Sequence, residues 1–275
     1  MTSARNHRVI PPPREVLRLL AREAHSGIID VPRAAKVLQV SPKAAATLLG
    51  RYARRGWLSR LRPGLYLILP LESGPTTTAA VEDPWVLAVE LFAPCYVGGW
   101  TAVEHWGFTE QLFRSTFVVS SRSVRSTELR VGASEFRVAR VRRSRLVGTT
   151  SVWRGSTRVP VSDPERTIVD ALIDPTWVGG IRHLADALLA YHESPRRDLR
   201  KLARTLEHLG RGAAIKRMGF LAERLWPAEK DLIAVAIEHR STGVIKLDPS
   251  VKTRGRLDKR WGLWVNTTVG ETAAG

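Results

Sequence analysis

The pattern of apolar and polar residues predicts three helices within the first 55 positions. Apolar residues at helical spacing predict the first helix over 14–25. An aspartate and a serine, each followed closely by a proline, predict two more helices over 31–38 and 41–55, because a first-turn proline removes an N–H that has no partner there. Residues 57–68 form two strand-like runs around a Pro-Gly turn, which predicts a hairpin. Helix, helix, short turn, helix and hairpin is the order of a winged helix-turn-helix.

The third predicted helix has an apolar face and a basic face. Spacing places Ala45, Leu48, Leu49 and Tyr52 on the inner face, and Lys43, Thr47, Arg51 and Arg54 on the outer face. Long cationic side chains reach phosphates or guanine edges, and threonine makes a shorter contact. We therefore expect this helix to enter the major groove of double-stranded DNA. The remaining predicted DNA-binding residues, several of which would hold phosphates, are Arg33, Lys36, Ser41, Arg55, Arg60 and Arg62. The alternative is a basic helix that is simply solvated.

The rest of the chain alternates between short strands and helices. Residues 73–83 are rich in Thr, Ser, Gly and Pro and carry no helical or strand period, which predicts a linker. We expect a winged helix-turn-helix over 1–72 and a larger α+β domain over 84–275. That larger domain should contain a modest sheet and a helical subdomain, because short alternating strands precede a series of amphipathic helices.

Charge strengthens the prediction of a polyanionic partner. The 275 residues include 43 Lys+Arg and 26 Asp+Glu, a formal net charge of +17. Residues 1–72 hold 13 Lys+Arg and 4 Asp+Glu, so +9 of that charge lies in the first quarter of the chain. Such an excess favours nucleic acid first and an anionic membrane surface second. No apolar stretch reaches the roughly 20 residues that a membrane span needs, so we expect a cytoplasmic protein with no membrane partner.

Catalytic patterns are weak. The single cysteine, Cys95, excludes an internal disulfide and a cysteine-based zinc site. Asp163, Glu165 and Asp170 resemble a metal-binding set, and His105 is a possible acid or base. Asp163 is better explained as a helix cap, however, and Arg166 can pair with Asp170 one turn away. We expect no enzymatic activity, catalytic residue, cofactor or metal; the alternatives are a metal-dependent nuclease or a stand-alone transcription factor whose larger domain senses a ligand.

A second basic stretch spans Arg122 to Arg145 and contains eight arginines. Interleaved Val, Phe and Ala predict strands with an exposed charged face. This stretch is either a solvated sheet face or an additional contact to DNA or to an acidic protein.

Several segments after the predicted linker resemble AbiEi-family antitoxins. They are GGWTAVEHWGFTEQ (98–111), VSDPERTIVDAL (161–172), IKRMGFLAE (215–223), KLDPS (246–250) and RWGLWVN (260–266). In that family a winged helix-turn-helix precedes these segments in the same order. The resemblance implies a component of a type IV toxin–antitoxin system that binds inverted repeats in its own promoter, with cooperative binding possible, and represses its operon. It also implies that the C-terminal domain counteracts a nucleotidyltransferase-like toxin.

Overall fold

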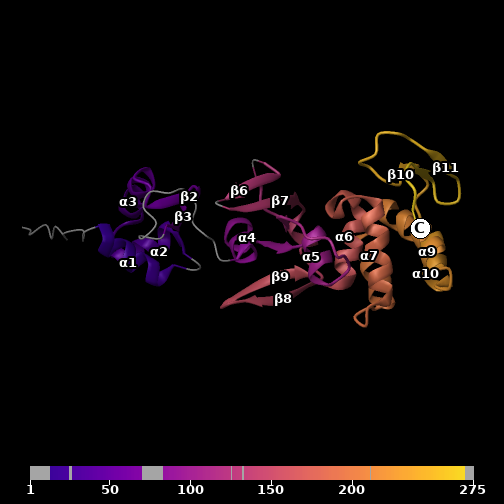
Figure 1. The fold of residues 1–275 in the computed structure, drawn as a ribbon, viewed down its shortest axis with the longest axis horizontal. Coiled ribbons are helices and arrows are strands. Elements are labelled where there is room, and N and C mark those ends of the chain that lie inside the picture. The colour runs from indigo at the N-terminus through magenta and orange to yellow at the C-terminus, as the bar shows by residue number, and fades with distance from the viewer. Residues whose placement is uncertain are drawn as a thin grey trace, which may run out of the picture. The chain divides into compact units, whose positions relative to one another are not determined.

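The computed structural model describes residues 13–24, 27–69, 83–124, 126–131, 133–210 and 212–269. The predicted linker, apart from Asp83, lies outside the described residues. The fold is mixed α+β, as the sequence predicts (Figure 1). The chain divides into two compact units, one formed by 1–91 with 130–134 and the other by 92–129 with 135–275.

In the first unit, helices and a small sheet follow one another as the polar pattern predicts. The elements are α1 (Pro13–Glu23), β1 (Ile28–Asp30), α2 (Val31–Leu38), α3 (Pro42–Arg54), β2 (Leu58–Arg62) and β3 (Leu65–Ile68). Asp30 caps α2, since its Oδ1 accepts a hydrogen bond from the backbone N–H of Arg33 at 2.7 Å. The strands form an antiparallel sheet of order β1-β3-β2. The predicted hairpin is confirmed, and Gly64 in its turn has φ +79°, a conformation that glycine adopts without steric cost.

After α4 (Pro84–Phe92), a six-stranded sheet has the order β6-β7-β5-β4-β9-β8. Its strands are β4 (Cys95–Val97), β5 (Ser115–Ser120), β6 (Glu128–Val131), β7 (Ser134–Arg140), β8 (Thr149–Arg154) and β9 (Thr157–Ser162). Strands β5 and β7 are parallel, as are β4 and β9, whereas β4–β5 and β8–β9 are antiparallel. The sequence pattern predicts strands over 117–119, 128–131, 136–141, 151–154 and 157–161, which correspond to every strand of this sheet except β4.

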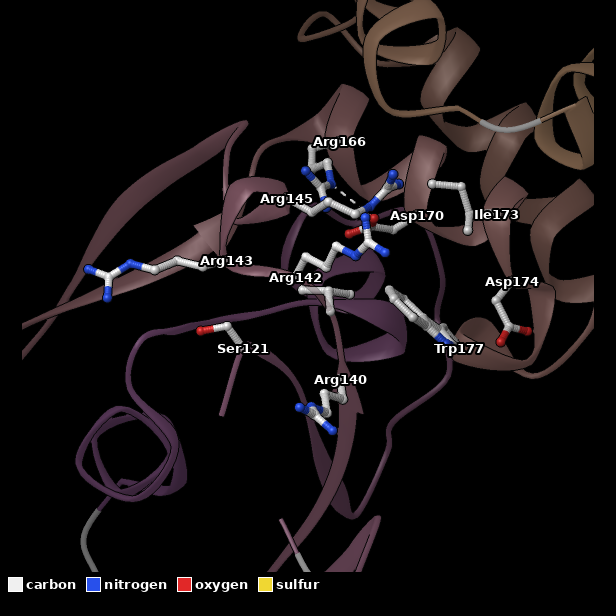
Figure 2. Close-up of a pocket in the computed structure, with 11 residues that line it drawn as sticks. Ser121, Arg140, Arg142, Arg143, Arg145, Arg166, Asp170, Ile173, Asp174 and Trp177 are labelled. Atoms are coloured by element: carbon white, nitrogen blue, oxygen red, sulfur yellow. Dashed lines mark hydrogen bonds and ion pairs between the residues drawn. The ribbon is translucent and has the colours of Figure 1, made fainter. Parts of the chain in front are cut away.

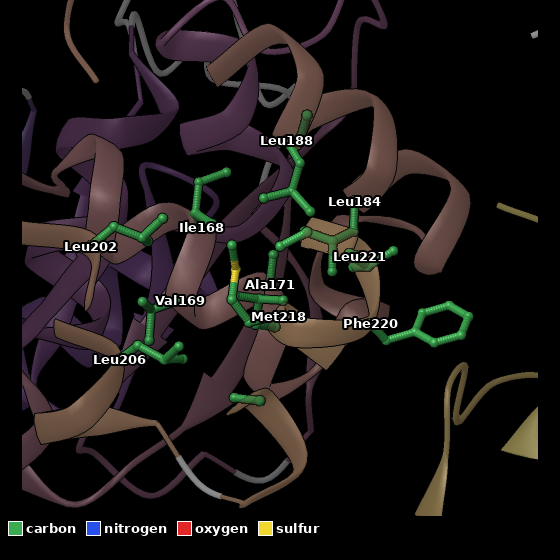
Figure 3. Packing of buried hydrophobic residues seen from close by; sticks show 14 of the residues in the cluster. Ile168, Val169, Ala171, Leu184, Leu188, Leu202, Leu206, Met218, Phe220 and Leu221 are labelled. Carbon is green, nitrogen blue, oxygen red and sulfur yellow. The ribbon is translucent and has the colours of Figure 1, made fainter. Parts of the chain in front are cut away.

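The second unit also contains a helical layer around α6 and a small C-terminal sheet. Its helices are α5 (Gly99–His105), α6 (Pro164–Ile173), α7 (Ile181–Glu193), α8 (Leu199–Leu209), α9 (Gly212–Leu225) and α10 (Lys230–His239), and the sheet has the order β10 (Ile245–Lys246), β12 (Leu263–Val265), β11 (Arg256–Asp258). Ile168, Val169 and Ala171 of α6 are fully buried. Figure 3 shows them packed among leucines of α7 and α8 and Met218 of α9. Burial of this apolar surface is the main force that holds the layer together.

Arg217 joins the end of α6 to the C-terminal part of the chain. Its guanidinium donates to the carbonyl oxygens of Leu172 at 2.9 Å and Ile173 at 3.1 Å, in the last turn of α6. It also donates to the carbonyls of Leu247 at 2.8 Å and Lys246 at 3.2 Å. The last carbonyls of a helix have no partner within it, and a cation there interacts favourably with the helix dipole. This arginine, in the segment 215–223, therefore stabilises the fold.

A second buried arginine links α6 to the six-stranded sheet. The predicted pair of Arg166 and Asp170 is confirmed, with Nε and Oδ1 2.9 Å apart, but both side chains are only 1% exposed. Tyr96 of β4 completes the network, because its hydroxyl donates to Asp170 at 2.6 Å and accepts from Arg166 at 2.7 Å. Arg166 also donates to the carbonyl of Val147 at 2.7 Å. Burial and the neighbouring Asp170 carboxylate raise the pKa of Tyr96, so its hydroxyl stays protonated.

We predict that replacing Arg166 by Leu lowers the free energy of unfolding by about 3–5 kcal/mol, because it leaves the Asp170 carboxylate buried without its cation. The triple variant Tyr96→Phe/Arg166→Leu/Asp170→Leu should recover much of that loss, since it removes all three polar partners together. Urea denaturation measures both. Arg204→Leu, at an exposed position of α8, is the control and should change stability by no more than about 0.5 kcal/mol. A single-variant loss as small as that of the control would contradict the account.

Candidate nucleic-acid interface

The inner face of α3 is part of the core of the first unit. Ala45, Leu48, Leu49 and Tyr52 are all at most 5% exposed, which confirms the inner face that the spacing predicts. They pack against buried residues of α1, α2 and the sheet, among them Leu20 and Ile29. Since α3 is fixed along this side, its opposite side must face away from the core.

The outer face of α3 carries the predicted groove-binding residues. Lys43, Thr47, Arg51 and Arg54 are exposed, and on a regular helix they lie within an arc of about 80°. Within the described part of the chain, no carboxylate forms a salt bridge with Lys43, Arg51 or Arg54. Arg51 lies over the ring of Tyr52, 5.9 Å from its centroid. The Thr47 hydroxyl donates to the carbonyl of Lys43 at 3.0 Å. The face is therefore cationic, and no described carboxylate neutralises it.

The remaining predicted DNA-binding residues lie on α2, at the ends of α3 and on the hairpin. Ser41 is exposed and caps α3, since its Oγ accepts a hydrogen bond from the backbone N–H of Ala44 at 3.2 Å. Arg55, the residue after α3, and Arg60 on β2 are exposed, whereas Arg62, at the end of β2, is half-buried. Lys36 is exposed and Arg33 half-buried; both line a groove of about 720 Å³ between α1 and α2, together with Arg22. The structure thus gives Ser41 a structural role in addition to the predicted one.

Gly50 is a feature of this face that the sequence analysis does not identify. It lies in the interior of α3, where glycine is less favourable than alanine by roughly 0.5–1 kcal/mol. A Cβ at this position would meet only the end of the Arg54 side chain, at 3.9 Å, so packing within the protein does not require glycine. Helical spacing places Gly50 about 20° from Lys43, on the cationic face. A glycine of this kind is typical of a site where a ligand approaches the backbone closely.

The carboxylates that suggested a metal site have structural partners. Asp163 caps α6 through a 2.8 Å bond from the backbone N–H of Arg166, and Lys201 lies 3.0 Å from its other oxygen. Glu165 is buried, pairs with Lys201 at 2.7 Å and accepts a hydrogen bond from Tyr191. Asp170 belongs to the network with Arg166 and Tyr96. Among the described residues, no group of three or more His, Cys, Asp or Glu side chains could hold a metal ion.

His105, the other candidate for catalysis, packs beside Trp106, with ring centroids 4.6 Å apart. Burial, Arg154 and Arg196 lower the pKa of His105, so the ring is neutral near pH 7. Trp106 donates from Nε1 to the carbonyl of Ser162 at 2.8 Å, which ties α5 to β9. The His105 ring therefore packs against an aromatic side chain, and Glu104 lies on a different side of the same short helix.

Comparisons with known proteins bear on the fold alone. No family model matches the sequence, and no curated protein matches it. Among the described residues, no helix has both the length and the apolar character to cross a bilayer. The fold is similar to the crystal structure of the RV2827C protein from Mycobacterium tuberculosis, with a TM-score of 0.58 and 18% sequence identity over 91% of this chain and 89% of that chain. This mixed α+β fold, over nearly its whole length, is thus shared with a mycobacterial protein.

Proposed function

We propose that the first unit is a winged helix-turn-helix that binds double-stranded DNA, with α3 in the major groove and the β2–β3 hairpin against the backbone. The observation that carries this proposal is the division of α3 into a fully buried apolar face and an exposed cationic face. Arg51 and Arg54 are long enough to reach guanine edges or phosphates, and Thr47 makes a shorter contact. Arg60 on the hairpin adds a phosphate contact outside the groove.

The proposed role of this binding is repression of the chain's own operon through inverted repeats in its promoter. The larger unit would then counteract a cognate nucleotidyltransferase-like toxin in the cytoplasm. This second part rests on the resemblance of segments in 98–266 to AbiEi-family antitoxins. In the structure, those segments supply buried tethers such as Arg166 and Arg217. These segments favour a scaffold shared with that family, and the residues that contact the toxin would lie elsewhere on the surface of the unit.

Removal of a base-contacting arginine should differ from removal of a phosphate-contacting one. We predict that Arg51→Ala costs about 1–3 kcal/mol of binding free energy and relaxes preference at one base position. Arg60→Ala should weaken binding to all sequences alike and reduce the slope of log K against log [salt] by about one unit. Gel shifts with the DNA upstream of the reading frame, at two salt concentrations, measure both effects.

Arg204→Ala is the charge-matched control for these measurements, because Arg204 is exposed on α8 in the other unit. Equal affinity of the unmodified protein for the upstream DNA and for a scrambled duplex would overturn the proposal of a sequence-specific repressor.

Gly50→Ala should change stability and DNA binding in opposite directions. Alanine should raise the free energy of unfolding by about 0.5–1 kcal/mol, because it favours the helix and its Cβ meets only the end of the Arg54 side chain at 3.9 Å. The added methyl group should weaken specific DNA binding, because it stands between the α3 backbone and the groove. Thermal unfolding and gel shifts on the same preparation measure the two effects. A variant that is stabilised and binds DNA as tightly as the parent would show that α3 does not approach DNA through this face.

The antitoxin role predicts that co-expression of this chain rescues bacterial growth from a neighbouring nucleotidyltransferase-like gene product. The combined variant Lys43→Ala/Arg51→Ala/Arg54→Ala should lose repression of a promoter reporter and keep the rescue when expressed from an unrelated promoter, because the two roles belong to different units. Growth curves and reporter fluorescence measure them. Absence of rescue by the unmodified chain would contradict the antitoxin role and leave the DNA-binding prediction to its own test.

A further inference from the structure

The second unit contains a cavity of about 730 Å³ that none of the preceding functions uses. It lies between the segment that follows β7 and the end of α6, with the short 3₁₀ helix Pro175–Val178 beside it. Figure 2 shows the side chains that line it, which come from parts of the chain as distant in sequence as Ser121 and Trp177. Cavities of roughly 300–1,000 Å³ are the usual size of small-molecule sites.

Arginine dominates the lining of this cavity. The cationic residues are Arg140, Arg142, Arg143, Arg145 and Arg166, and the acidic residues are Asp170 and Asp174, so the formal balance is about +3. Asp170 is already bound by Arg166 and Tyr96. Asp174 caps the 3₁₀ helix, since its Oδ1 accepts from the backbone N–H and the hydroxyl of Thr176. Both carboxylates are therefore committed to bonds within the fold.

Three of the arginines are exposed at the edge of the cavity. Arg140, Arg142 and Arg143 are exposed, and no carboxylate of the described residues forms a salt bridge with them. In Figure 2, Arg142 points toward Arg145 and Asp170, whereas Arg140 and Arg143 point away from them. The guanidinium of Arg145 donates to the carbonyl of Leu209 at 2.6 Å, and this bond fixes the position of the Arg145 side chain. Guanidinium groups that line one cavity repel one another, and an anion with several oxygens would relieve this repulsion.

One wall of the same cavity is apolar. Val141, Ile173 and Trp177 line it, and Trp177 is half-buried. One side of the Trp177 ring packs against Phe117, with centroids 5.4 Å apart, so the indole is held in place by the core. A fixed tryptophan at the edge of a cationic cavity offers a stacking surface to a planar ring, as in many sites that bind bases.

We propose that this cavity binds a nucleotide, with its phosphates on Arg142 and its base against Trp177. A nucleotide combines several negative oxygens with a planar ring. The cavity combines arginines with an indole ring, and its volume of about 730 Å³ is in the range of small-molecule sites. Arg145 and Arg166 are positioning residues in this site. Arg145 is held by its hydrogen bond to Leu209, and Arg166 by its hydrogen bonds to Asp170 and Val147, so both keep the wall of the cavity next to Arg142 in place. All of these residues belong to the second unit, so the proposal does not depend on DNA binding.

Isothermal titration calorimetry of the full chain with ATP, without DNA and without divalent cations, tests the proposal. We expect saturable binding that Arg142→Ala weakens about tenfold or more, because a charge-assisted bond to phosphate is lost. Arg204→Ala removes an equal charge from an exposed position of α8 and should change affinity less than about twofold. Both variants alter exposed side chains, so circular dichroism should show the same unfolding temperature as for the parent.

Two further probes separate the parts of the ligand. Adenosine should bind far more weakly than ATP, because it lacks the phosphates. Tripolyphosphate should also bind more weakly, by about fivefold or more, because it cannot stack on Trp177. Absence of saturable ATP binding, or equal ATP affinity of the parent and Arg142→Ala, would overturn the proposal. Equal affinity for tripolyphosphate and ATP would overturn the assignment of the site to nucleotides.

Discussion

The burial of one side of α3 is the constraint on which the proposed function depends. Leu49 and Tyr52 sit in the core of the first unit with Ala45 and Leu48, and rotation of the helix would expose apolar surface worth about 25 cal/mol per Å². Because this side cannot turn outward, the cationic side cannot turn inward. The hairpin that follows places Arg60 on a second exposed element. Packing of the core therefore places two sets of cationic side chains at the surface, one on α3 and one on the hairpin.

Polar groups hold the second unit in a different way. Arg166 and Arg217 are buried, and each binds backbone carbonyls or side chains from other elements. Trp261, in the turn between β11 and β12, also binds another element, since its Nε1 donates to Glu223 of α9 at 2.6 Å. Loss of one partner from a buried polar network costs more than loss of a surface pair. Arg166, Arg217 and Trp261 all lie in segments on which the proposed resemblance to antitoxins rests, and in the structure these residues hold the fold together.

Much of the fold could be predicted from the sequence because its determinants are local. The predicted helix over 31–38 agrees with α2 in full, since its aspartate cap, first-turn proline and apolar spacing define it within a few residues. The strand β4 was missed, because three apolar residues inside a longer apolar run carry no alternation. Its partners β5 and β9 lie about 20 and 60 residues later in the chain, so only tertiary pairing defines it.

The candidate sites divide in the same way. The two faces of α3 follow from spacing alone, and burial confirms the inner one. The cavity could not be predicted, because Arg142 and Trp177 are distant in the sequence and line one cavity only in the folded chain. Sequence reasoning could have identified Gly50 as a glycine on the basic face of a predicted helix. Only the structure shows that packing does not require glycine there, because a Cβ would meet only the end of the Arg54 side chain.

The most direct test of the central claim is site-specific photo-crosslinking to a duplex from the upstream region. A photoreactive residue at position 47 of α3 should crosslink to bases within the protected sequence, and the same residue at position 204 of α8 should not. Efficient crosslinking from position 204 with none from position 47, in a protein that binds the duplex, would contradict the claim that the exposed face of α3 enters the groove.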